Sequence, residues 1–138
     1  MATLNSGSFV LKLGAMRPRI VIVDDDPTFL ATVRLLLEAE GFEVVGEALT
    51  GLDGVAAATE LDPNLVLVDV GLPDIDGFEV VERITAGEDP PPVVLTSIRS
   101  ADDFGSLVET SRARAFITKD DITGEALVGF LDGSAATA

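Results

Sequence analysis

The stretch LVLVDVGLPDIDGFEV, residues 65–80, decides the fold expected of this chain. It opens with four apolar residues, 65–68, a short run rich in β-branched side chains that is typical of a strand buried on both faces. Asp69 follows at the carboxyl end of that strand, where open parallel sheets place their ligand crevice. A loop rich in glycine and proline comes next, and a helical pattern begins at Phe78. The stretch therefore predicts one strand–loop–helix unit of an α/β sheet.

The same alternation runs through most of the chain. Apolar runs predict five strands, at residues 20–23, 42–48, 65–68, 93–95 and 113–118. Helical patterns between and after them predict five helices, at about 27–40, 52–61, 78–86, 101–111 and 123–132. The first helix is expected to pack one face inward, formed by Phe29, Leu30, Val33, Leu36 and Leu37. Alternating strands and helices predict an α/β domain, a parallel sheet with right-handed crossovers and helices on both faces.

The composition excludes several classes of function. There is no cysteine and no histidine, which excludes a disulfide framework, a thiolate nucleophile and a Ser-His-Asp triad. The formal net charge is −15, so we expect no direct binding to nucleic acid or to an anionic membrane. Nucleophilic and acid–base chemistry must therefore fall to carboxylates, hydroxyls or lysine.

The domain organisation is simple. We expect a disordered N-terminal extension over residues 1–18, one domain over 19–132 and a small tail over 133–138. No apolar run approaches the length of a membrane span, and the first residues lack the basic segment of a signal peptide. The expected location is cytoplasmic.

Polar residues follow four of the predicted strands. Asp24 and Asp25 follow the first, Asp69 the third, Thr96 lies at the end of the fourth and Lys119 follows the fifth. Each has an ordinary explanation alone, as a turn aspartate, a strand-exit hydroxyl or a surface lysine. Because the carboxyl ends of parallel strands lie on one edge, all five are expected to meet in one crevice. Together they predict a site for phosphoryl chemistry.

The charge of this crevice predicts a bound cation. Two carboxylates about 5 Å apart repel by roughly 3 kcal/mol at an effective dielectric constant of about 20. Three are tolerable only with a cation between them or with shifted protonation. Oxygen donors without histidine or cysteine indicate a hard ion, Mg²⁺. Asp69 could then attack phosphorus, with Lys119 and Thr96 meeting the charge on the transferred oxygens.

Four motifs resemble the receiver domain of two-component response regulators over about residues 19–132. They are IVIVDDDP (20–27), LVLVDVGLPDIDG (65–77), VVLTS (93–97) and AFITKDD (115–121). The resemblance implies a flavodoxin-like, doubly wound, five-stranded parallel sheet of strand order 2-1-3-4-5, with the site at its topological switch point.

The resemblance also implies a role for each site residue. Asp69 matches the phosphoacceptor, Asp25 the acid that binds Mg²⁺ directly and Asp24 the acid that acts partly through water. The backbone carbonyl of Gly71 would complete the protein ligands of the metal. Thr96 and Lys119 match the pair that grip the phosphoryl oxygens, and Thr96 and Phe116 match the two switch positions.

Three positions depart from the family pattern. Many receivers place a proline with a cis peptide bond after the lysine, whereas Asp120 stands here, so the lysine loop must be held in another way. The residue two beyond the phosphoacceptor is Gly71, and the residue two beyond the threonine is Ile98. Neither residue can orient an attacking water, which predicts slow loss of the phosphoryl group.

The implied partners are proteins. A histidine kinase or a phosphotransfer protein would donate the phosphoryl group, and the domain would catalyse its own Mg²⁺-dependent phosphorylation and dephosphorylation. An unknown downstream protein would bind the face formed by the fourth helix, fifth strand and fifth helix, which would also serve a homodimer. Whether the domain acts alone or belongs to a longer DNA-binding regulator stays open.

Two alternatives come from other classes. A haloacid-dehalogenase-like phosphatase would use Asp24, Asp26 and Thr28 as its first motif, VVLTS as its second and Lys119 as its third, but it leaves Asp69 unexplained. A receiver-fold module that binds partners without phosphorylation is the other alternative.

Overall fold

A computed structural model describes residues 17–131. The strands are β1 (Arg19–Val23), β2 (Glu43–Ala48), β3 (Leu65–Asp69), β4 (Val93–Ser97) and β5 (Ala115–Thr118). The helices are α2 (Pro27–Ala39), α3 (Gly51–Leu61), α4 (Gly77–Thr85), η1 (Ala101–Phe104), α5 (Leu107–Thr110), η2 (Lys119–Asp121) and α6 (Gly124–Val128), where η marks a 3-10 helix. The predicted extension, apart from its last two residues, and the predicted tail lie outside the described residues.

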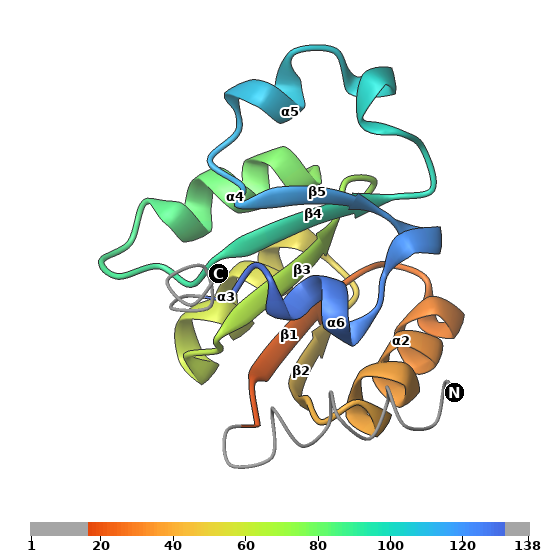
Figure 1. Cartoon of the computed structure of the whole chain (residues 1–138). Coiled ribbons are helices and arrows are strands. Elements are labelled where there is room, and N and C mark those ends of the chain that lie inside the picture. The colour runs from red at the N-terminus through yellow and green to blue at the C-terminus, as the bar shows by residue number, and fades with distance from the viewer. Residues whose placement is uncertain (1–16, 132–138) are drawn as a thin grey trace.

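The five strands form one parallel sheet of order β2-β1-β3-β4-β5 (Figure 1). This confirms the predicted doubly wound topology. All five residues of β3 are buried, as the continuous apolar run predicted for a central strand. The register pairs Val23 with Val68 and Asp69 with Thr96. Residues at the ends of β1, β3 and β4 are therefore neighbours at one edge of the sheet.

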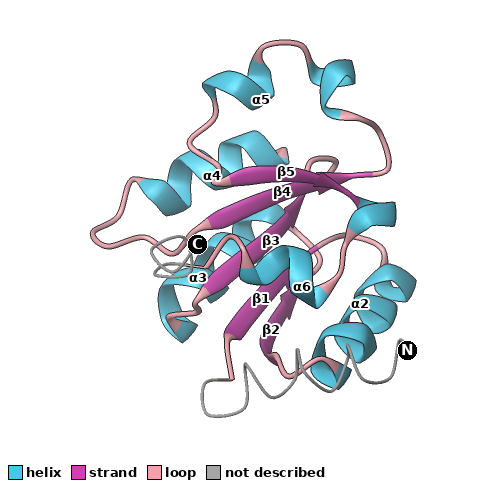
Figure 2. Cartoon of the chain, in the orientation of Figure 1, coloured by secondary structure: helices cyan, strands magenta, loops and turns pink. Residues whose placement is uncertain are grey.

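Helices cover both faces of the sheet (Figure 2). Because side chains of a strand alternate between faces, successive residues of β1, β3 and β4 enter two different cores. One core packs Ile20, Ile22, Leu65 and Leu67 with buried residues of α2 and with Leu127 of α6. The other packs the alternate residues of the same strands with α3 and α4. The sheet thus lies between two apolar layers.

The start of α2 follows the predicted pattern. Asp26 is its N-cap, and its carboxylate accepts a hydrogen bond from the Thr28 amide at 3.0 Å. Pro27 occupies the first helical turn. Leu30, Val33 and Leu37 are buried as predicted, but Leu36, which was also predicted to face inward, is exposed.

Among residues 17–131, no helix combines the length and the apolar content that a membrane crossing requires.

The helix predicted at 101–111 is wrong as a single element. The structure has the short 3-10 helix η1, then Gly105 with φ 59°, then the one-turn helix α5. A positive φ at Gly105 ends a right-handed helix. Neither short helix buries any residue, so no apolar face stabilises a longer one. The last helix is also shorter than predicted, because α6 ends at Val128.

Candidate functional site

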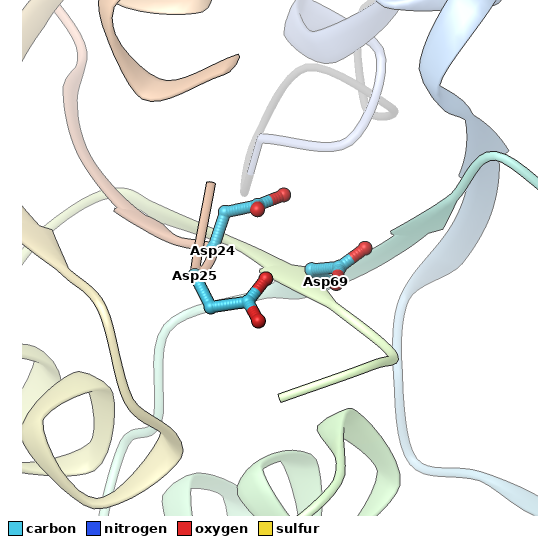
Figure 3. A group of neighbouring side chains, drawn as sticks. All are labelled: Asp24, Asp25 and Asp69. Atoms are coloured by element: carbon cyan, nitrogen blue, oxygen red, sulfur yellow. The ribbon is translucent and has the colours of Figure 1, made fainter. Parts of the chain in front are cut away.

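Three carboxylates gather where β1 and β3 end (Figure 3). One oxygen from each of Asp24, Asp25 and Asp69 lies within 4.8 Å of the others. Asp24 is fully buried and Asp69 is 7% exposed, whereas Asp25 lies at the surface. A cluster with only oxygen donors and one open side suits a hard divalent ion that keeps part of its water shell. The structure thus brings together the three predicted carboxylates, and their chemistry fits Mg²⁺.

Asp69 has an unusual charge balance. Burial raises the pKa of its carboxyl group from 3.8 to about 6, and the negative charge of Asp24 adds to the rise. Lys119 and the amide of Gly71, which donates to Asp69 Oδ2 at 3.2 Å, act in the opposite direction. A carboxylate whose charged form is disfavoured by burial and by a like charge is stabilised by a cation beside it.

Lys119 reaches into the same cluster from the end of β5. Its Nζ lies 2.7 Å from Asp24 Oδ2 and 3.4 Å from Asp69 Oδ1, and its side chain is 15% exposed. Burial alone would lower the pKa of the ammonium group, but the bonds and charges of the two aspartates outweigh it and raise the pKa. Lys119 therefore stays protonated and adds a positive charge to the pocket.

The loop that carries Lys119 is held by a side-chain hydrogen bond. Lys119 and the two residues after it form η2, and the Thr118 hydroxyl donates to Asp121 Oδ2 at 2.7 Å. No cis peptide bond occurs within the described residues. This bond spans the turn from β5 into η2. It therefore stabilises the lysine loop, which has Asp120 where many receivers have a proline.

Thr96 lies beside Asp69 in the sheet register and is 1% exposed. Its hydroxyl has no hydrogen-bond partner within residues 17–131. A buried hydroxyl without a partner is costly, and such groups mark places where a ligand supplies the missing bond. Thr96 is therefore available to a ligand oxygen bound next to Asp69.

Phe116 lies in an aromatic cluster that the sequence did not predict. Its ring is 5.8 Å from the ring of Phe104, which lies 5.8 Å from the ring of Phe78. Phe104 belongs to η1, the segment expected to be part of a regular helix. The half-buried ring of Phe116 is thus packed against the segment that follows β4.

Asp74 is a second residue that sequence reasoning missed. Its carboxylate accepts hydrogen bonds from the amides of Gly51 at 2.7 Å and Leu52 at 2.9 Å. These bonds, that of Leu52 first, lower the pKa of Asp74 to about 2. The loop after Asp69 is thereby fixed to the first turn of α3. The sequence gives no local signal for these bonds, because Asp74 lies in one loop and its partners begin a helix elsewhere in the chain.

We expect Asp74→Asn to lower the free energy of unfolding at pH 5 and above. The folded-state pKa lies below the ordinary value, so the stabilisation is present above about pH 4 and is lost as the pH falls toward 2. Urea unfolding of both proteins between pH 6 and pH 2 should show a difference that shrinks on acidification. Asp102→Asn, at an exposed aspartate in η1, is the control, and an Asp74→Asn curve parallel to it would contradict the assignment.

Comparison with known proteins decides the family. Residues 20–128 match the family described as the response regulator receiver domain. This chain belongs to the response regulator receiver family. It is 38% identical over 106 residues to the transcription regulator BvgA of Bordetella pertussis, covering 77% of this chain and 51% of BvgA. It is 37% identical over 90 residues to the transcriptional regulatory protein PrrA of Mycobacterium tuberculosis, covering 65% of this chain and 38% of PrrA.

Solved receiver domains have the same fold. The signal receiver domain of the response regulator NarL from Mycobacterium tuberculosis superimposes with a TM-score of 0.76 at 27% identity, covering 85% of this chain and 98% of that one. A CheY-like receiver domain from Methanospirillum hungatei gives a TM-score of 0.73 at 27% identity, covering 88% and 99%. The present receiver domain spans about half of BvgA and less of PrrA. Receiver domains bind Mg²⁺ at an acidic pocket, and the family implies a histidine kinase partner.

Proposed function

We propose that this receiver domain accepts a phosphoryl group on Asp69 and signals through a change of conformation. The observation that carries the proposal is the pocket itself. Two further carboxylates, a buried hydroxyl without a partner in residues 17–131 and an ammonium group surround Asp69, and together with Asp69 they come from the ends of four different strands. Phosphoryl transfer needs this combination, because its catalysis is positioning and charge stabilisation.

The chemical step is a displacement at phosphorus. A carboxylate oxygen of Asp69 forms a bond to phosphorus, and the P–N bond of a phosphohistidine on the donor protein breaks. The leaving imidazole takes up a proton, and an acyl phosphate remains on Asp69. Mg²⁺, held by Asp24, Asp25, Asp69 and the Gly71 carbonyl, would neutralise the charge of the phosphoryl oxygens. The Lys119 ammonium and the Thr96 hydroxyl bind those oxygens.

The new group alters the packing around Thr96. The phosphoryl group adds about two negative charges, which attract the Thr96 hydroxyl toward it. Phe116 then rotates into the space vacated, and its contact with Phe104 breaks. Both moves favour an active conformation of the face formed by η1, α5, β5 and α6. This face binds a downstream protein or a second copy of the chain. The proposed location of the protein is the cytoplasm.

The test uses a small phosphodonor. Incubation with acetyl phosphate and Mg²⁺ should add one phosphoryl group to the wild type, seen by intact-mass spectrometry, and chelation of the metal should prevent it. Asp69→Asn should remain unmodified. Asp76→Asn, which removes a charge from the N-cap of α4 outside the pocket, should be modified like the wild type. Equal modification of Asp69→Asn and the wild type would refute the proposal.

The alternatives have weaker support. In the phosphatase alternative Asp26 would be a catalytic acid, but its carboxylate is used to cap α2. A module that binds partners without phosphorylation would have no need of a buried Thr96 hydroxyl that no other group in residues 17–131 bonds. Asp69→Ala should therefore abolish phosphodonor-dependent partner binding, and unchanged binding would favour that module.

We expect the acyl phosphate to be long-lived. Gly71 has no side chain, and Ile98 is 84% exposed and apolar, so neither can hold an attacking water near phosphorus. Gly71→Asn should accelerate loss of the phosphoryl group roughly tenfold to a hundredfold by supplying an amide that orients water. Gly71→Val is the control, since it adds a side chain that cannot bind water. The decay is followed by mass spectrometry after removal of the donor, and a wild-type half-life of seconds would contradict this prediction.

A further inference from the structure

The ammonium group of Lys119 touches an aromatic ring as well as the acidic pocket. Its Nζ lies 4.1 Å from the centroid of the Phe29 ring, on α2. The Asp24 and Asp69 carboxylates contact the same Nζ. An ammonium group this close to the face of a ring is attracted by the ring's quadrupole. The lysine is thus held between two anions and a ring.

Phe29 packs at the edge of the core rather than inside it. The buried side of α2 is formed by Leu30, Val33 and Leu37, and Phe29 is only half-buried beside them. It lies two residues after Pro27, in the first turn of the helix, at the end that follows the acidic residues 24–26. The contact therefore joins the start of α2 to the residue that follows β5.

The carboxylates that contact Lys119 are not reserved for it. Asp24 and Asp69 are also candidate ligands of a divalent ion, and Asp69 is the proposed phosphoacceptor. When their charge is shared with a metal, they attract the ammonium group less. The Phe29 ring does not bind Mg²⁺, because this ion takes oxygen ligands, so its contact with Lys119 is unaffected when the metal binds.

We propose that Phe29 is a positioning residue for phosphoryl transfer, whose ring holds the Lys119 ammonium group over the pocket while the carboxylates bind other groups. The inference rests on the proposed function and adds a residue to it. Lys119 has a flexible four-carbon stem, and a wall on one side of its ammonium group limits where that group can go. The phosphoryl oxygens then meet a charge that is already in place.

The first measurement observes the contact directly. The sequence has only two lysines, Lys12 and Lys119, so protein labelled with ¹³C-lysine gives two ε-methylene signals in an NMR spectrum. Lys12→Arg assigns them. The Lys119 protons should be shifted upfield by the ring in the wild type, both without and with Mg²⁺. Phe29→Leu should abolish the shift, and Phe29→Tyr, which keeps a ring, should retain it.

The second measurement observes the consequence. With acetyl phosphate and saturating Mg²⁺, the Phe29→Leu variant should be phosphorylated at a rate roughly three- to thirtyfold lower than that of the wild type. The Phe29→Tyr variant should be phosphorylated at the wild-type rate. Phe130→Leu is the matched control, because Phe130 packs partly buried against the same core. Phe29→Met is a second ring-less variant, and thermal unfolding verifies that all variants are folded.

The outcomes separate the two proposals. An upfield shift that survives Phe29→Leu, or equal rates for Phe29→Leu and Phe130→Leu, would overturn the positioning role and leave Asp69 phosphorylation intact. A wild type that takes up no phosphoryl group would overturn the proposed function, and the positioning role with it.

Discussion

Replacing Asp25 with asparagine should weaken Mg²⁺ binding roughly ten- to a hundredfold and slow phosphorylation equally at limiting metal, because the pocket loses a full charge facing the ion. The fold should tolerate the change. Asp25 is exposed, and its carboxylate makes no hydrogen bond or ion pair within residues 17–131. Isothermal titration calorimetry with Mg²⁺ measures the affinity, and the phosphorylation rate at several metal concentrations checks the consequence.

The next residue provides the matched control. Asp26→Asn removes the same charge one position along the chain, and the amide oxygen of asparagine can still accept the hydrogen bond of the Thr28 amide. Long-range repulsion therefore changes equally in the two variants. Asp26→Asn should bind Mg²⁺ nearly as tightly as the wild type. If Asp25→Asn bound the metal as tightly as Asp26→Asn, the assignment of Asp25 as a ligand would be wrong.

Gly77→Ala should destabilise the fold and disturb the pocket at the same time. Gly77 begins α4, and a Cβ atom on it would lie 2.5 Å from the Asp69 carbonyl oxygen and 2.8 Å from the Val70 Cα atom. Both are backbone atoms that cannot give way without moving β3. Overpacking of this kind costs about 1–3 kcal/mol. Displacement of Asp69 should also slow phosphorylation, since an error of about 1 Å in a reacting group can cost roughly a hundredfold.

Another glycine near α4 gives the comparison. At Gly87 a Cβ atom would meet its nearest neighbour, the Ile84 carbonyl oxygen, at 3.6 Å, an ordinary contact. Gly87→Ala should change the free energy of unfolding by less than about 0.5 kcal/mol. Urea unfolding measures both variants. Equal stability of Gly77→Ala and the wild type would show that α4 does not pack closely against the backbone at the end of β3.

The fold was predictable because its signals are local. The apolar run before Asp69 identifies a buried strand without reference to any other residue, and Asp26-Pro27 identifies the start of a helix. The order of the strands came from the resemblance to receiver domains, and the structure confirms it. The segment after β4 was predicted poorly, because its helical composition is overridden by the backbone of Gly105 and by the lack of a buried face.

The candidate site was predictable to the same extent. Asp24, Asp69 and Lys119 each lie where a strand ends, so the topology alone brings them together. The contacts of Phe29 with Lys119 and of Asp74 with α3 were not predictable, because each joins segments far apart in the sequence through side-chain orientation. Phe29 was assigned to the inward face of its helix, and only the approach of β5 gives its ring a second partner.

The most direct test of the central claim is a crystal structure with Mg²⁺ and beryllofluoride, a stable mimic of a phosphoryl group. We expect the beryllofluoride to be bound to the Asp69 carboxylate, with Mg²⁺ between Asp69 and Asp25 and the fluorine atoms in contact with Thr96 and Lys119. A pocket that stays empty at saturating concentrations of both, with Asp69 turned away from Asp25, would contradict the account.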